Sequence, residues 1–262
     1  MRSLQILPST TSHKHEALLP TLDVFARLGF LDLDLNLNHI VERGTQVDDV
    51  RQRLAANGQR VWIVSGGWCD FFDAPPAASA TVASVDRQAA LARAFGVDRL
   101  RLFFGRLPMT HCSPDRIASA AANIRAVAER HPDLLLMFEN HDGASASPDV
   151  CGAILECVGR SNVGLTFDPI NFVHRGVAPM DALARLARLV VHVHLKGYEA
   201  GTFCGFGGGD VDLRPVVRAL VDGGYGGAFT VEYEGAGDRT VRLFESVRRA
   251  ESEIAGLTAS IR

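Results

Sequence analysis

Cysteines are few in this sequence and follow no spacing that would pair or group them. There are five, an odd number, and no two stand in a Cys-x-x-Cys motif. Neither a disulfide framework nor a cysteine-ligated zinc site is therefore expected. We interpret all five as buried thiols, namely Cys69, Cys112, Cys151, Cys157 and Cys204.

The sequence also lacks long apolar runs and an excess of charge. No run of about eighteen apolar residues occurs, and the apolar stretch near the start is too short for a secretory signal. The 27 lysines and arginines stand against 30 aspartates and glutamates, which gives a net charge of −3 at pH 7. This balance is not that of a protein that binds phosphate backbones or anionic membranes. We expect a soluble, cytoplasmic protein with no nucleic-acid or membrane partner, and a homo-oligomer is left open.

Linkers, low-complexity tracts and blocks of like charge are absent as well. With 262 residues and 47% hydrophobic content, the chain is long enough to bury about three quarters of its unfolded surface. We therefore predict one domain over residues 1–262. The glycine-rich stretch Cys204–Asp210 is interpreted as a mobile loop and not as a domain boundary.

Short runs rich in Val, Ile, Leu and Phe recur along the whole chain and predict strands. Segments between them carry apolar residues at helical spacing, for example Ser84–Phe95, Pro114–Arg130, Ala178–Leu189 and Leu213–Val221. Eight strand-then-helix units favour a parallel sheet closed into a single (β/α)8 TIM barrel. A doubly wound sheet is the weaker alternative, because no GxGxxG motif follows the first strand. The predicted strands are Leu4–Leu7, Leu31–Leu37, Val61–Val64, Leu100–Phe104, Leu134–Phe138, Val163–Phe167, Val190–Leu195 and Ala228–Tyr233.

Ionisable residues stand at the carboxyl ends of the last four predicted strands. Alternate residues of a barrel strand point inward, and the carboxyl ends of the strands form the active-site face. An ionisable residue of inward parity at such an end is therefore a candidate for chemistry. The residues of this parity are Glu139 and His141, then Asp168, then His192, His194 and Lys196, and finally Thr230, Glu232 and Glu234.

Four of these residues, Glu139, Asp168, His194 and Glu232, are predicted to converge beside the barrel axis. Neighbouring carboxylates raise one another's pKa and do not all stay ionised unless a cation neutralises them. We therefore expect one divalent metal ion. Three oxygen donors and one nitrogen favour Mn²⁺, Mg²⁺ or Co²⁺ over Zn²⁺, which stays possible. The alternative is four unrelated strand-end residues, each paired with an arginine from a loop.

Lys196 stands out because it is one of only two lysines among the 27 basic residues. A compact ammonium at an inward strand end suits a substrate oxyanion or a proton transfer, although it can also merely neutralise the carboxylates. His141 is placed for substrate contact or acid–base chemistry. His192 lies one layer deeper, where a hydrogen bond toward the substrate site is expected rather than metal binding. Arg106 and Glu234 are candidates at the rim of the site.

Five segments gain specificity from their shared order and spacing: MFENH (Met137–His141), GLTFDPIN (Gly164–Asn171), HVHLKG (His192–Gly197), GGGDVDL (Gly207–Leu213) and GGAFTVEYEG (Gly226–Gly235). At these segments the sequence resembles the xylose isomerase-like TIM barrels, the sugar phosphate isomerase/epimerase superfamily. That superfamily also contains inosose dehydratase-like and endonuclease IV-like branches. The resemblance covers nearly the whole chain. It implies that Glu139, Asp168, His194 and Glu232 hold one catalytic divalent metal.

The resemblance also assigns positions around the substrate. Asp34 corresponds to a glutamate that the family often carries in its second strand, and Asn171 stands where its sugar epimerases commonly have histidine. Gly197 and Gly208 likewise replace an aspartate and a glutamate. Such positions contact substrate in relatives, so we expect Asp34 and Asn171 to bind substrate. The differences make a ketose epimerase of the best-known type a weaker expectation.

The combined expectation is a metal-dependent isomerase or epimerase that acts on a sugar, or a sugar-like hydroxycarbonyl, through an enediolate. Its catalytic residues are predicted to be Glu139, Glu232, Lys196 and His141. A metal-dependent dehydratase (a lyase) of the inosose or 3-dehydroshikimate type is the closest alternative, because it shares the enolate. Further alternatives are an endonuclease IV-like phosphodiesterase, a Schiff-base aldolase that uses Lys196, and a non-catalytic partner subunit.

Overall fold

The computed structural model describes residues 4–74 and 77–259. It consists of two compact units. The terminal unit is made of Met1–Trp62 and His192–Arg262, and the central unit is Ile63–Val191. The prediction of a single domain over residues 1–262 stays a prediction.

Four parallel strands form the sheet of the terminal unit: β1 (Ile6–Pro8), β2 (Asp32–Asn36), β7 (Val190–Leu195) and β10 (Phe229–Val231). β1 pairs with β10, and β10 pairs with β7, both in parallel register. A parallel bridge between Ser9 and Asp34 puts β2 on the other side of β1. The carboxyl ends of β2, β1, β10 and β7 therefore follow one another along one edge of this sheet.

The helices of the terminal unit are α1 (Leu18–Arg27), α2 (Asn38–Val41), α3 (Val47–Ala56), α9 (Arg214–Asp222) and α10 (Arg239–Ala259), with a 3-10 turn η1 (Thr10–His13). α10 packs on β1 and β10, and α9 packs on α10. Apolar residues at helical spacing face inward: Leu18, Leu22 and Phe25 of α1 are at most 2% exposed. Burying each such side chain contributes about 1.5–3 kcal/mol, so packing rather than helix propensity holds α1 in place.

A short antiparallel hairpin, which the sequence analysis did not predict, follows β7. Its strands are β8 (Gly197–Glu199) and β9 (Thr202–Cys204). The glycine-rich stretch after it is a loop that folds back on the hairpin, because the Asp210 N–H donates to the Tyr198 carbonyl oxygen over 2.8 Å. Gly207 and Gly209 have φ values of 75° and 82°, a conformation that side chains disfavour.

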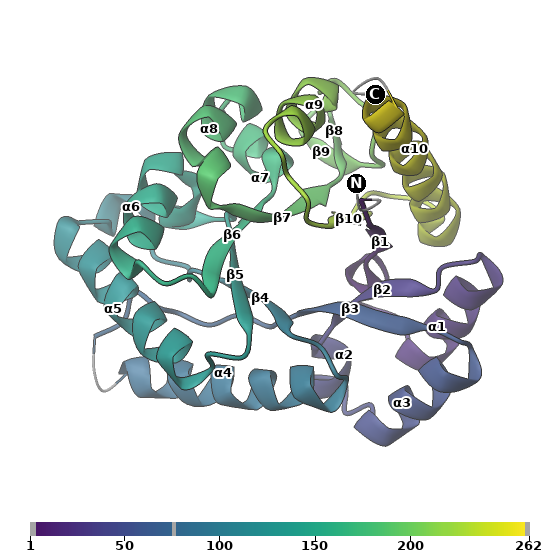
Figure 1. Cartoon of the computed structure of the whole chain (residues 1–262), viewed down its shortest axis with the longest axis horizontal. Helices are drawn as coiled ribbons and strands as arrows, with labels where there is room; N and C mark the ends of the chain where they lie inside the picture. The colour runs from purple at the N-terminus through teal and green to yellow at the C-terminus, as the bar shows by residue number, and fades with distance from the viewer. Residues whose placement is uncertain (1–3, 75–76, 260–262) are drawn as a thin grey trace. The chain divides into compact units, whose positions relative to one another are not determined.

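The central unit has the strands β3 (Arg60–Ser65), β4 (Arg99–Phe103), β5 (Leu135–Glu139) and β6 (Val163–Phe167), paired in parallel and in chain order. Figure 1 shows α4, α5 and α6 along the outer side of these strands. The helices are α4 (Ala77–Ala94), α5 (Pro114–Arg130), α6 (Pro148–Val158), α7 (Pro169–His174) and α8 (Pro179–Leu186), with 3-10 turns η2 (Met109–His111), η3 (Gly143–Ala146) and η4 (Ala187–Leu189).

Local sequence explains where the central helices begin. Ser113 and Ser147 are the N-caps of α5 and α6, and each hydroxyl accepts a hydrogen bond from the backbone N–H three residues on. Proline follows each serine at the first helical position, where its missing N–H costs nothing. α6 then ends at Gly159, whose φ of 60° closes the helix. These caps fix the loops that precede α5 and α6.

Strands and helices alternate through the chain, and the strand order β1-β10-β7-β6-β5-β4-β3-β2 is that of a (β/α)8 TIM barrel. The predicted fold class is confirmed. Each predicted strand overlaps an observed one, with differences of a few residues at the ends. Within the described residues, no helix is long and apolar enough to cross a membrane.

All five cysteines are free thiols, as expected, but they are not all buried. Cys69 and Cys151 are buried, whereas Cys112 and Cys204 are half-buried. The prediction is wrong for Cys157, which is exposed. α6 turns Ile154, Val158 and its other apolar residues inward, so Cys157 falls on the solvent side of the helix.

Two buried histidines of the terminal unit make its stability depend on pH. His13 and His39 are at most 2% exposed, and burial is the main cause that lowers the pKa of each below its ordinary value near 6.5. Glu16 and Asp238 oppose this effect at His13, and the Thr10 carbonyl opposes it at His39. The folded state therefore binds these protons less readily than the unfolded chain does.

We expect the free energy of unfolding to fall as pH drops below about 6.5, by at most about 1.4 kcal/mol per pH unit for each histidine. Urea unfolding at pH 7.5 and pH 5.5 measures the difference. His39→Gln should reduce the difference, because glutamine does not titrate. A variant with the same pH dependence as the wild type would show that His39 contributes nothing.

Candidate functional site

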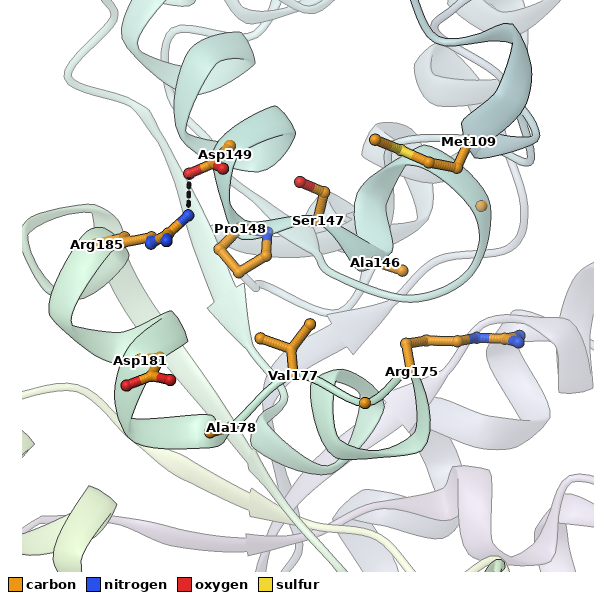
Figure 2. A pocket seen from close by; sticks show the side chains of 12 residues that line it. Met109, Ala146, Ser147, Pro148, Asp149, Arg175, Val177, Ala178, Asp181 and Arg185 are labelled. Carbon is orange, nitrogen blue, oxygen red and sulfur yellow. Dashed lines mark hydrogen bonds and ion pairs between the residues drawn. The ribbon is translucent and has the colours of Figure 1, made fainter.

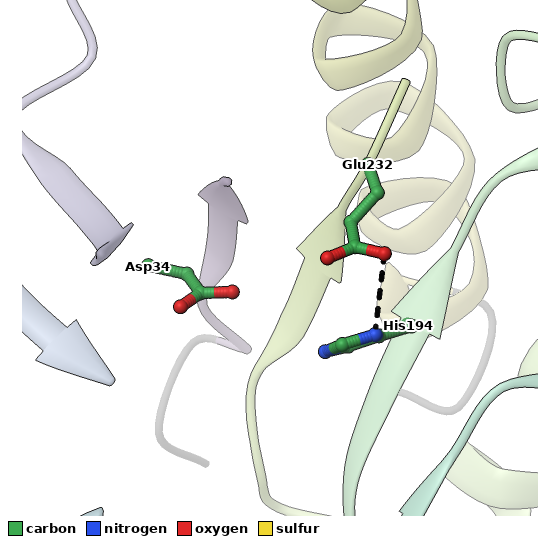
Figure 3. A group of neighbouring side chains, drawn as sticks. All are labelled: Asp34, His194 and Glu232. Atoms are coloured by element: carbon green, nitrogen blue, oxygen red, sulfur yellow. Dashed lines mark ion pairs between the residues drawn. The ribbon is translucent and has the colours of Figure 1, made fainter. Parts of the chain in front are cut away.

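The terminal unit brings together Asp34 of β2, His194 of β7 and Glu232 at the end of β10 (Figure 3). His194 and Thr230 are register partners in the paired strands β7 and β10. Glu232 is two residues beyond Thr230 and therefore has the same inward parity. The three side chains are at most 3% exposed. One ligand atom from each lies within 4.8 Å of the other two. Two carboxylates and an imidazole thus converge at the carboxyl ends of the strands.

The charge of Glu232 is held by its neighbours. Burial alone would raise its pKa, but His194 and Lys196 lower it to about 2. Glu232 Oε2 lies 3.5 Å from His194 Nδ1. Glu232 Oε1 is buried, and among the residues that the structure describes it has no hydrogen-bond partner. A buried, ionised oxygen without a donor fits a bound cation, and the oxygen and nitrogen donors around it are those of a divalent metal site.

Both lysines of the chain pair with one carboxylate above this cluster. Lys196 Nζ donates to Glu234 Oε2 over 3.0 Å, and Lys14 Nζ donates to Glu234 Oε1 over 2.8 Å. Lys196 is 1% exposed and lies 4.6 Å from the Phe203 ring centre, whereas the Lys14 side chain is 42% exposed. Lys196, with burial opposing and Lys14 helping, holds the pKa of Glu234 at about 2. The rim residue Glu234 is therefore the ionic partner of Lys196.

Glu139 and Asp168 of the central unit are joined by Asn171. Asp168 is the N-cap of α7, and its Oδ1 accepts hydrogen bonds from the backbone N–H groups of Ile170 and Asn171, both 2.9 Å. The Asn171 side chain donates to Glu139 Oε1 over 3.0 Å and to the Asn140 carbonyl over 2.9 Å. Both hydrogens of the Asn171 amide are thus used inside the protein. Its predicted contact with substrate stays a prediction, for which only the amide oxygen is left.

Arg101 is a buried residue of this site that the sequence analysis missed. Its Nε lies 3.2 Å from Glu139 Oε2, and its Nη1 donates to the Gly66 carbonyl over 3.2 Å. The side chain is 3% exposed, so this is a desolvated ion pair. The available signal was an arginine between Leu100 and Leu102 in an otherwise apolar strand.

His141 lies against a pair of stacked aromatic rings. Trp68 and Phe103 stack at 4.0 Å, and the imidazole of His141 meets each ring edge-on at 5.2 Å. The guanidinium of Arg106 lies 4.1 Å from the Trp68 ring centre. Phe103 is the last residue of β4, and the other three follow the carboxyl ends of β3, β4 and β5, where a barrel binds its substrate. Arg106 is exposed, and its predicted role at the rim, in substrate binding, stays a prediction.

His192 of the terminal unit lies one layer below His194. It is 1% exposed, and its ring contacts the His194 ring edge-on at 5.1 Å. This position agrees with a supporting role toward His194. The predicted role of His192 in substrate binding stays a prediction.

A separate cavity of about 690 Å³ lies in the central unit, beside the start of α6 and of α8 (Figure 2). Its wall includes Arg175, Val177 and the ion pair of Asp149 with Arg185. None of the predicted site residues is among those that line it. The Asp149–Arg185 pair is exposed and serves below as a control.

Fold and site together define an α/β barrel with buried carboxylates and imidazoles near the carboxyl ends of its strands. A family model described as the xylose isomerase-like TIM barrel matches residues 23–257, so the chain belongs to that family. The inosose dehydratase of Clostridium perfringens is 24% identical over 153 residues, which are 51% of this chain and 51% of that protein. The match thus spans about half the length of this curated relative.

Solved structures share the fold over nearly the full chain. A structure of L-ribulose 3-epimerase aligns with a TM-score of 0.84 at 17% identity, covering 99% of this chain and 97% of that one. A xylose isomerase-like TIM barrel protein from Mycobacterium smegmatis in complex with magnesium aligns with a TM-score of 0.80 at 20% identity, covering 98% of both chains. Likeness at these identities shows the fold.

The two ion pairs of Glu234 should differ in their contribution to stability. We expect Glu234→Gln to lower the free energy of unfolding by roughly 2–3 kcal/mol, because it removes the ionic partner of a buried ammonium. Lys14→Met should cost less than about 1 kcal/mol, because that pair is exposed. Urea unfolding of both variants measures this. Equal losses would contradict the assignment of Glu234 as the partner of Lys196.

Proposed function

We propose that this protein is a divalent-metal-dependent enzyme that moves a proton beside the carbonyl group of a small sugar-like substrate. An isomerase or epimerase is the first candidate. The observation that carries the proposal is the buried cluster of Asp34, His194 and Glu232, in which Glu232 is ionised and its Oε1 has no donor among the described residues. Such an oxygen is available to a cation and, as a base, to a proton of the substrate.

The metal ligands in this proposal are Glu139, Asp168, His194 and Glu232. Each lies within one residue of the carboxyl end of a strand, and these ends form the active-site face of this fold. Hard oxygen donors with one imidazole favour Mg²⁺, Mn²⁺ or Co²⁺ over Zn²⁺, and one relative in the family fold is a magnesium complex. When bound, the metal would stabilise negative charge that develops on the substrate's carbonyl oxygen.

The protein's own groups would then handle the proton and the substrate. Glu232 takes the proton from the carbon next to the carbonyl group. Glu139 is held in place by Asn171 and Arg101, so we assign it the role of a fixed metal ligand. Lys196, held by Glu234, keeps a positive charge near the reacting oxygen atoms. Asp34 accepts a hydrogen bond from a substrate hydroxyl, and the Trp68 and Phe103 rings offer a surface for C–H groups.

A dehydratase is the second candidate, because the curated relative that matches by sequence is an inosose dehydratase. Dehydration begins with the same loss of a proton and then expels a β-hydroxyl group, which needs an acid. His141, which is 30% exposed, is placed to supply it. An endonuclease-like activity is disfavoured, since the net charge is −3 and nucleic-acid binding needs a basic surface.

The first test of this proposal concerns the metal. Protein purified without chelator should contain about one divalent ion per chain. Glu139→Gln and Asp168→Asn should each lower the occupancy at least about tenfold, because each removes a charged ligand. Elemental analysis measures this, with Asp149→Asn as a control that removes an exposed carboxylate. Full occupancy in both ligand variants would overturn the proposed metal set.

The second test identifies the reaction. The metal-loaded enzyme is incubated in D₂O with ketoses, aldoses, inososes and 3-dehydroshikimate. We expect product and deuterium at the carbon next to the carbonyl for isomerisation or epimerisation, and a conjugated alkene absorbance for dehydration. Glu232→Gln should lower every such activity by roughly a hundredfold or more. Inert carbonyl substrates together with metal-dependent cleavage of abasic-site DNA would replace the proposal with the nuclease alternative.

A further inference from the structure

His141 is held more firmly than a loop residue at the mouth of a site usually is. Its backbone N–H donates to the Ser145 hydroxyl over 3.2 Å, and that hydroxyl donates to the Asp142 carbonyl over 3.0 Å. The ring lies edge-on to both Trp68 and Phe103. Main chain and ring are therefore fixed, while 30% of the side chain still faces solvent.

The Nδ1 side of the imidazole faces a carboxylate. His141 Nδ1 lies 3.3 Å from Asp142 Oδ2, which is an ion-pair distance although the two atoms are not aligned as a hydrogen bond. The other oxygen of Asp142, Oδ1, accepts a hydrogen bond from the Arg175 guanidinium. Arg175 thus fixes the carboxylate, and the carboxylate faces one particular ring nitrogen.

Arg175 is the C-cap of α7, the helix whose N-cap is Asp168. The helix has only 6 residues, so the proposed metal ligand and the partner of Asp142 stand at its two ends. A carboxylate beside one nitrogen of a histidine favours the tautomer with hydrogen on that nitrogen. Nε2, on the other side of the ring, then carries a lone pair directed away from Asp142.

We propose that Asp142 and Arg175 are positioning residues that hold His141 in its Nδ1–H tautomer, with Nε2 presented to a hydroxyl group of the substrate. This rests on the proposed function. Aldose–ketose conversion exchanges a hydroxyl and a carbonyl on neighbouring carbons, so one oxygen must lose a proton and the other must gain one. Nε2 accepts the proton as the first O–H bond breaks, Asp142 compensates the imidazolium charge, and the same proton passes to the second oxygen.

The tautomer can be measured without any substrate. Protein labelled with ¹⁵N in its 9 histidines gives two-bond ¹H–¹⁵N spectra, in which the signals missing from His141→Gln identify residue 141. At pH 8 we expect the Nδ1–H form. Asp142→Asn should shift it toward the Nε2–H form, because asparagine can also donate toward Nδ1. Asp149→Asn, the matched exposed carboxylate, should leave the spectrum unchanged.

Kinetics give the second readout, on whichever carbonyl substrate is turned over. Asp142→Asn and Arg175→Gln should lower kcat at least about tenfold with less than a twofold change in KM, because the tautomer affects proton transfer more than binding. Arg175→Lys should restore part of kcat. A wild-type Nε2–H tautomer, or Asp142→Asn with unchanged spectrum and kcat, would overturn the inference. If no carbonyl substrate is turned over, the proposed function fails, and the spectra still decide the tautomer.

Discussion

Burial of negative charge at the strand ends is the constraint on which the rest of this structure depends. Asp34, Glu139, Asp168 and Glu232 are each at most 3% exposed, although an isolated carboxylate costs several kcal/mol to remove from water. Such groups persist in a folded protein only where donors or cations compensate them. Many of the buried hydrogen bonds and ion pairs in the two units stabilise these carboxylates.

The buried carboxylates differ in how many of their oxygens have a donor or a cation beside them. This difference distinguishes their proposed roles. Glu139 has a donor or a cation at each oxygen, from Asn171 and Arg101. Asp168 Oδ1 accepts hydrogen bonds from two backbone N–H groups at the start of α7. Glu232 has an imidazole beside one oxygen and no donor among the described residues at the other. A carboxylate held on both sides is a fixed ligand, whereas one with an open oxygen can also accept a proton.

Strand periodicity explains why much of this was predictable from sequence. An alternation of two residues fixes which side chains point inward, so the ends of the last strands predict that Glu139, Asp168, His194 and Glu232 form a group, which stays a prediction, while the burial of all four is observed. The same rule gave the fold class, since eight apolar runs separated by helical segments leave few alternatives. The observed strand ends differ from the predicted ones by a few residues, because hydrogen bonding, and not hydrophobicity alone, decides where a strand stops.

Contacts made by loops escaped the sequence analysis for a different reason. The pairing of Lys14 with Glu234 joins residues 220 positions apart, and Lys14 belongs to no periodic segment. Trp68 follows β3 by three residues, and no alternation rule fixes the direction of a side chain after its strand has ended. The hairpin β8–β9 was missed because each strand has only 3 residues, too few to show a pattern. Arg101 was missed although it stands as a charged residue between Leu100 and Leu102 in an otherwise apolar strand.

The short helix α7 positions several of the polar side chains that contact the site. Its N-cap is Asp168, its third residue is Asn171, and its C-cap is Arg175, so one turn and a half of helix carries three polar groups with separate partners. Asn171 reaches Glu139, and Arg175 reaches Asp142. Because helix geometry fixes the spacing of these groups, a displacement of α7 would change the environment of Glu139 and of Asp142 together. The same short helix therefore positions both Glu139, at the end of β5, and Asp142, in the loop that follows β5.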